Sequence, residues 1–157
     1  MDEVSGFSEA METDMDDRPC FDPASREAVL DAIRSALAAE PGIRWAYVFG
    51  SLGRGEPFRD ADVAVAVEPG GLSTWRSLGR LSRTLARATG LEGLEVDVFD
   101  VRRCPLPMVS EILRDGVVVT DSTPVERRLW ECEVTWRWLD FRHVWEARER
   151  IGTASGS

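Results

Sequence analysis

The chain has 157 residues, 43% of them hydrophobic, and a formal net charge of −9, which suits one domain with a single core. No apolar run approaches the about 18 residues that cross a bilayer, and an acidic protein is a poor binder of nucleic acid, because phosphate must be neutralised. The chain opens Met1-Asp2-Glu3, acidic where a secretory signal peptide is basic, so we expect a cytoplasmic protein that contacts neither membrane nor nucleic acid.

The negative charge is concentrated at the N-terminal end. Residues 1–17 hold seven acidic residues and no basic one, whereas the remainder holds 21 acids against 19 arginines, a balance of −2. Because residues 1–21 contain few aliphatic side chains, we predict a disordered acidic tail there. A folded domain over 22–151 and a flexible end over 152–157 then complete the chain. The tail is either a solvated extension or an arm that touches a basic partner.

The predicted helices and strands alternate along the chain. Runs of branched and aromatic residues predict strands at 43–49, 62–67, 94–101 and 117–120. Helical periodicity predicts helices at 22–42, 73–90, 106–116 and 124–151. Asp22 is placed to cap the first helix, and Ser73 begins the second. The order predicts an α/β (α+β) fold, in which a small mixed sheet is flanked by helices and followed by a long C-terminal helix.

The last predicted helix has a clear start and an aromatic stripe. The sequence Thr-Pro-Val-Glu at 123–126 matches a capping box with proline at the first helical position. One face then carries, at helical spacing, Trp130, Val134, Trp138, Phe141 and Trp145. In one interpretation this stripe packs on the sheet. In the other it contacts a protein partner, since aromatic residues are enriched at interface cores and four tryptophans fall within sixteen residues.

The candidate functional residues begin in the segment FGSLGRGEPFRDADVAV, residues 49–65. Gly50 lets the backbone approach a ligand, Ser51 offers a hydroxyl to a phosphate oxygen, and Arg54 supplies positive charge. Asp62 lies on the strand that follows, and Asp97 lies on the next one. Carboxylates on neighbouring strands hold Mg²⁺ together with substrate phosphates. The pattern therefore indicates phosphoryl or nucleotidyl chemistry.

Residues 26–150 resemble a minimal nucleotidyltransferase of the DNA polymerase β superfamily, in particular the antitoxin of HEPN/MNT toxin–antitoxin pairs. Those proteins carry Gly-Ser, ten residues, Asp-x-Asp and a third Asp on a later strand. Here GSLGRGEPFRDADVAVAV and EVDVFDV match that pattern in part. The resemblance implies a palm-like fold, ATP as substrate with Mg²⁺, and a hetero-oligomer with a cognate HEPN ribonuclease toxin. It also implies either AMP transfer to a toxin tyrosine or simple binding of the toxin.

The acidic strand departs from the family pattern. Asp62 follows the Gly-Ser pair after ten residues, and Ala64 stands where the family has its second metal-binding Asp. In this register Asp62 and Asp97 remain as metal ligands, and we expect weak or absent nucleotidyl transfer. In the alternative register Asp60 and Asp62 form the pair, and together with Asp97 they make an active Mg²⁺-dependent protein adenylyltransferase. We favour the first register, because the apolar strand then continues as it does in the family.

Overall fold

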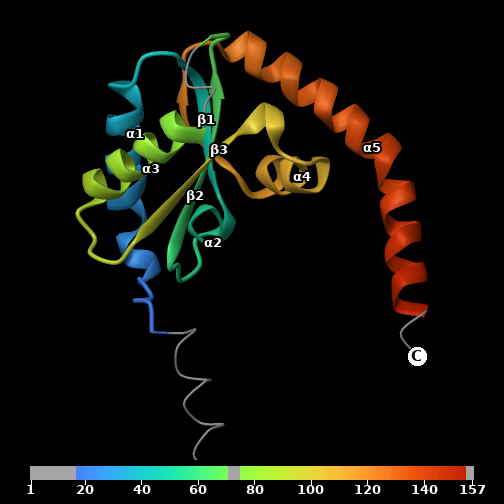
Figure 1. Cartoon of the computed structure of the whole chain (residues 1–157), viewed down its shortest axis with the longest axis horizontal. Coiled ribbons are helices and arrows are strands. Elements are labelled where there is room, and N and C mark those ends of the chain that lie inside the picture. Colours follow the sequence, from blue (N-terminus) through green and yellow to red (C-terminus); the bar gives the residue numbers. More distant parts are fainter. Residues whose placement is uncertain (1–16, 71–74, 155–157) are drawn as a thin grey trace, which may run out of the picture.

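The computed structural model describes residues 17–70 and 75–154. The elements in chain order are η1 (Pro23–Ser25), α1 (Arg26–Ala38), β1 (Ile43–Phe49), α2 (Gly50–Arg54), β2 (Asp60–Val67), α3 (Trp75–Thr89), β3 (Glu95–Asp100), η2 (Val101–Arg103), α4 (Leu106–Asp115), β4 (Val117–Asp121) and α5 (Pro124–Ala154). The strands form one mixed sheet in the order β3-β2-β1-β4, with only the β2–β3 pair parallel. Helices α1 and α3 cover one face, and α4 and α5 lie on the other (Figure 1).

The predicted fold class is confirmed, and most bounds lie close to the predicted ones. Strand β2 begins earlier than predicted, because Asp60 pairs with Glu95 at the start of the parallel ladder. Asp22 caps the first turn as predicted, since its Oδ1 accepts from the backbone N–H of Ala24 at 2.8 Å. The predicted start of the next helix at Ser73 lies outside the described residues, and α5 continues to Ala154.

The N-terminal tail was predicted over 1–21, and residues 1–16 lie outside the described part of the chain. The residues that follow contact the domain. Phe21 forms a backbone bridge with Phe58, and their rings stack with centroids 5.6 Å apart. Arg18 forms an ion pair with Asp60 at 2.8 Å. Contacts with the sheet therefore begin ahead of Asp22, the predicted start of the domain.

The core has two parts, one on each face of the sheet. Along β2, Ala61, Val63 and Val65 pack with α1 and α3. The alternate residues Ala64 and Ala66 pack with the other cluster, which includes aromatic side chains of β1. Because side chains of a strand alternate between faces, Asp62 shares its face with Ala64.

A polar network joins the first half of α5 to the sheet. The Tyr47 hydroxyl donates to Glu131 at 2.6 Å, and Arg127 pairs with both Glu131 at 2.6 Å and Asp121 at 2.7 Å. Burial, followed by the hydrogen bond to Glu131, raises the pKa of Tyr47, so its hydroxyl stays protonated. Trp130 adds apolar contact, with its ring 5.9 Å from that of Trp45.

The predicted capping box at the start of α5 does not form. The Thr123 hydroxyl is buried and has no hydrogen-bond partner among the described residues. The Glu126 carboxylate instead pairs with Arg44 and with Arg102. Two guanidinium groups are stronger partners for a carboxylate than one backbone N–H, which explains why the local pattern is overridden.

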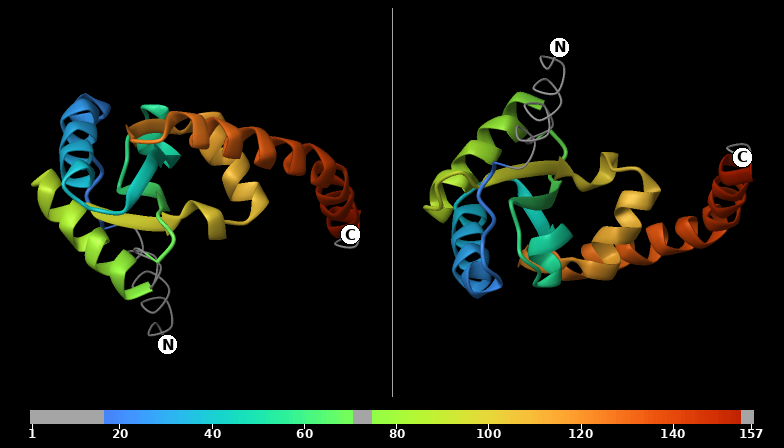
Figure 2. Two further views of the ribbon diagram at one scale, coloured as in Figure 1. Left: turned by 90° about the horizontal axis from the view of Figure 1, so that it is seen from above. Right: turned by 90° about the horizontal axis from the view of Figure 1, so that it is seen from below.

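The second half of α5 projects away from the sheet, as two views of the ribbon show (Figures 1 and 2). Val134 is the buried residue of the helix. Beyond it, large apolar side chains are exposed, including Trp136 at 70%, Trp145 at 37% and Ile151 at 69%. The start of the stripe thus packs on the sheet through Trp130, whereas Trp145, near its end, is exposed. Within the described ranges, no helix has the length and apolar character that crossing a membrane requires.

Replacing Arg127 tests how strongly the polar network holds α5. Arg127→Ala leaves Asp121 and Glu131 largely buried without their cation, so we expect the free energy of unfolding to fall by about 2 kcal/mol in urea denaturation. The matched control is Arg137→Ala, which removes a pair with Glu133 between exposed side chains and costs under about 1 kcal/mol. Equal losses in the two variants would contradict this account of the network.

Candidate functional site

The turn after β1 brings its backbone against a carboxylate of β2. Gly50 adopts φ +68°, in the left-handed region that favours glycine, and leads directly into α2. A Cβ placed on Gly50 would lie 2.4 Å from Oδ2 of Asp62. The left-handed backbone favours glycine at this position, and a side chain there would also have to displace the Asp62 carboxylate.

The sheet places Asp62 beside Asp97. Asp62 pairs with Phe49 on one side, at the end of β1, and with Asp97 on the other, in the parallel ladder with β3. Residues directly paired in a ladder point to the same face, so the two carboxylates are neighbours. The structure thus brings together two carboxylates that the sequence pattern assigns to one candidate site. Asp62 is half-buried and Asp97 is exposed.

The charge around Asp62 is predominantly negative. Burial, and then the carboxylates of Asp97 and Asp60, raise the pKa of Asp62 to about 6. Arg54 lowers this pKa, and Glu111 of α4 raises it. Near neutral pH the ionised form of Asp62 is therefore destabilised by burial and by its acidic neighbours. A bound cation would reduce this destabilisation.

The neighbouring carboxylates fit one divalent cation. Mg²⁺ in proteins is commonly bound through one or two carboxylates, with substrate phosphates and waters completing its shell. Asp62 and Asp97 meet that requirement, since the parallel ladder sets them side by side. Among residues 17–70 and 75–154, no group of three or more His, Cys, Asp or Glu is arranged to hold a metal ion.

A second cation with a ligand at position 64 does not fit. The Ala64 methyl lies on the same face as Asp62, is fully buried, and pairs in register with Tyr47 and Phe99. Phe49 and Phe99 extend this apolar cluster, with ring centroids 5.9 Å apart. Beyond Asp62, position 64 on this face of β2 therefore offers no oxygen ligand.

The other predicted site residues lie around this pair of carboxylates. Asp60 is two residues before Asp62, at the start of β2, and its carboxylate is held by Arg18. Ser51 lies in the first turn of α2 and is half-buried. Arg54 ends α2 and pairs with Glu56 at 3.1 Å and with Asp115 at 3.7 Å.

Two residues that sequence reasoning missed also shape the site. Arg26 of α1 donates from Nε to the carbonyl of Leu52 at 2.9 Å, and from a second nitrogen to the carbonyl of Gly53 at 3.2 Å, which anchors α2. Glu111 of α4 adds negative charge near Asp62. Neither residue belongs to a local motif, so only the folded arrangement reveals it.

A cavity of about 480 Å³ lies apart from these carboxylates. It is formed by η2, α4 and α5 near the start of β1, and its lining includes Trp45, Arg102 and Trp130. Since Gly50 and Asp62 lie at the other end of β1, this cavity belongs to the α5 side of the molecule.

Residues 31–124 match a family model described as Polymerase beta, Nucleotidyltransferase. Among solved structures, the chain is similar to one chain of a toxin–antitoxin with AMP-PNP (21% identity, TM-score 0.64, covering 82% of this chain and 98% of that one). It is similar to one chain of the toxin–antitoxin MntA-HepT (17% identity, TM-score 0.57, covering 85% of this chain and 98% of that one). It is also similar to one chain of tri-AMPylated Shewanella oneidensis HEPN toxin in complex with MNT antitoxin (18% identity, TM-score 0.57, covering 85% of this chain and 98% of that one). No curated protein matches by sequence.

Substituting Gly50 tests the close approach to Asp62. Gly50→Ala introduces a strained backbone and a methyl group that meets Asp62, so we expect a loss of about 2 kcal/mol in unfolding free energy. The control Gly42→Ala also has a left-handed φ, +87°, but its methyl meets nothing within 4 Å, and it should cost about 1 kcal/mol. Urea denaturation that finds equal losses would refute the contact with Asp62.

Proposed function

Because the chain belongs to the polymerase β nucleotidyltransferase family, we propose that it is an antitoxin of the minimal nucleotidyltransferase type. It binds and neutralises a HEPN ribonuclease toxin in a hetero-oligomer, and it transfers AMP weakly or not at all. The observation that carries the proposal is the buried Ala64 beside an otherwise well-formed Gly50–Asp62 turn. A site built in this way favours a role in binding over one in catalysis.

The fold likeness to chains of toxin–antitoxin complexes supports a HEPN partner. The shape of α5 supports it independently. Trp136 and Ile151 are exposed on one side of the projecting helix and Trp145 on the opposite side, and large exposed apolar side chains of this kind are typical of interaction sites. Tryptophan in particular is enriched among the residues that dominate binding energy.

Two hollows beside α5 are suited to receive side chains of such a partner. One is the cavity of about 480 Å³ next to Trp130. The other, of about 270 Å³, lies between α4 and α5, and Leu113 and Trp138 are among its lining residues. Pockets that bury an anchor side chain next to an aromatic stripe are the usual core of a protein–protein interface.

The residues at the Gly50 turn would bind ATP through its phosphates. The Ser51 hydroxyl and the Arg54 guanidinium lie on the α2 side of the turn and would contact the phosphates. A Mg²⁺ ion held by Asp62 and Asp97 would neutralise phosphate charge. AMP transfer in two-metal sites also requires stabilisation of the attacking oxygen. Ala64 offers no ligand for that purpose, which is why we expect transfer to be impaired.

An active adenylyltransferase that uses Asp60, Asp62 and Asp97 is the alternative. It is favoured by one observation, that the charge of Asp60 raises the pKa of Asp62 and therefore lies near it. In this alternative the ion pair between Asp60 and Arg18 must open before Asp60 can hold a metal. The two proposals differ in which substitution changes AMP transfer.

Toxin binding is tested with a HEPN protein encoded beside the gene. We expect the wild-type chain to co-purify with it and to restore growth of cells that express it. The double variant Trp136→Ala, Trp145→Ala should weaken binding, measured by titration calorimetry, by at least about tenfold. Val125→Ala is the control, because Val125 is about as exposed as Trp136 but lies at the start of α5. A wild-type chain that neither binds nor neutralises the toxin would overturn the proposal.

Impaired transfer is tested by incubating the chain with ATP, Mg²⁺ and the HEPN partner, followed by intact mass measurement. The wild-type chain should leave the partner mass unchanged or nearly so, whereas Ala64→Asp should add AMP. Unfolding of each variant is followed in parallel, because position 64 is fully buried.

Efficient AMP addition by the wild-type chain would contradict the proposal, whatever Ala64→Asp does. If Asp60→Ala then abolished this addition, the alternative register would be correct.

A further inference from the structure

Helix α3 carries an arginine face. Its sequence contains no acidic residue, and its four arginines, Arg76, Arg80, Arg83 and Arg87, are spaced four, three and four residues apart. At 3.6 residues per turn these positions fall on one side of the helix. All four are exposed, whereas Leu81 and Leu85 of the same helix are buried in the core. We call these four residues the α3 arginine face.

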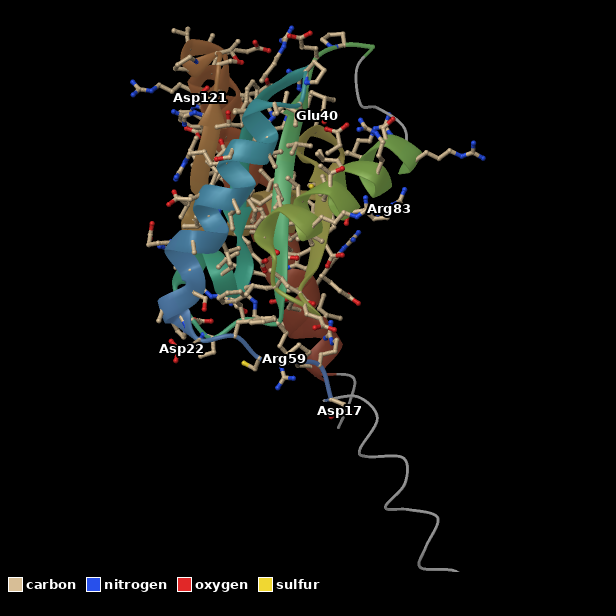
Figure 3. All side chains as sticks on the ribbon, turned by 90° about the vertical axis from the view of Figure 1, so that its left-hand side faces the viewer. Asp17, Asp22, Glu40, Arg59, Arg83 and Asp121 are labelled. Atoms are coloured by element: carbon tan, nitrogen blue, oxygen red, sulfur yellow. The ribbon has the colours of Figure 1, made fainter. Side chains whose placement is uncertain are left out.

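Much of the positive charge on this face is uncompensated. Arg80 pairs with Glu40 at 2.6 Å. For Arg83 and Arg87, the described part of the chain supplies no carboxylate within ion-pair distance. Figure 3 places Arg83 on the side of α3 away from α1. Arg83 and Arg87, the two without an ion-pair partner among the described residues, lie about one turn apart and form a positive surface that attracts a polyanion.

The chain contains a matching polyanion, residues 1–17, with seven acidic residues and no basic one. This segment joins the domain close to the end of α3. Pro19 packs on Gly93, in the turn between α3 and β3, where a Cβ on Gly93 would lie 2.6 Å from the proline ring. Arg18 holds the next contact, with Asp60 at 2.8 Å and Glu95 at 3.7 Å.

The segment is long enough to cover the arginine face. Sixteen extended residues span up to about 53 Å, at about 3.3 Å per residue. Helix α3, with 15 residues, is about 22 Å long. The segment is therefore longer than the helix that it would have to cover.

We propose that residues 1–17 bind along the α3 arginine face of the same chain and screen it from other polyanions. The charges are complementary, the segment leaves the domain at the near end of the helix, and its length suffices. Each exposed pair contributes little by itself, and salt weakens all of them. The contact is therefore reversible and sensitive to ionic strength. This inference does not depend on the antitoxin role.

The test uses the ¹⁵N-labelled full chain and the backbone amide signals of residues 2–16. In the wild type, we expect these signals to shift when NaCl is raised from about 20 mM to about 500 mM, because screening releases the segment. In Arg83→Glu, Arg87→Glu they should already lie near their high-salt positions. The control Arg137→Glu, Arg142→Glu changes the same charge on α5 and should leave the tail signals as in the wild type.

Three results would overturn the proposal. Tail signals that ignore both salt and the α3 variant would show that the segment does not bind there. A dependence on protein concentration would assign the contact to a second copy. The α3 amide signals are also followed on addition of single-stranded RNA, both in the wild type and in a chain whose tail acids are neutralised. Equal responses in the two chains would show that the face is open to nucleic acid. The unfolding midpoint of each variant verifies that the fold is kept.

Discussion

The close approach of Asp62 to Gly50 is the constraint on which the rest of the site depends. It accompanies a left-handed backbone that favours glycine at the end of β1, and a side chain at that position would have to displace the Asp62 carboxylate. It requires the β1–β2 register that pairs Phe49 with Asp62. The parallel pairing of β2 with β3 then brings Asp97 alongside. A slip of one residue in either ladder would turn Asp62 to the opposite face and remove the site.

The same sheet face changes chemical character within two residues. At Asp62 it is acidic and half-open, and at Ala64 it becomes part of a closed aromatic cluster with Tyr47 and Phe99. This cluster continues through Trp45 and Trp130 to the polar network that fixes the start of α5. The apolar residue at position 64 therefore fits a chain whose aromatic packing runs along this face.

Patterns of neighbouring residues predicted the strands and identified Gly50 and Asp62 as candidate site residues, because strand alternation and loop length are local properties. The contact between the two residues is seen only in the folded chain. Partners distant in sequence could not be predicted. Arg26 anchors α2, and Glu126 pairs with Arg44 and Arg102 instead of capping its own helix. Helical periodicity identified the stripe of α5 but could not divide it at Val134, since packed and partner-binding faces show the same spacing.

The central claim is that this fold retains a one-cation site and lacks the two-cation site of an efficient nucleotidyltransferase. A crystal structure with Mn²⁺ and a non-hydrolysable ATP analogue tests it most directly, because anomalous scattering locates and counts the ions. The account predicts one ion, bound by Asp62, Asp97 and phosphate oxygens, with Ala64 still packed among its aromatic neighbours. Two ions bridged by Asp62, with Asp60 released from Arg18 as a ligand, would contradict it.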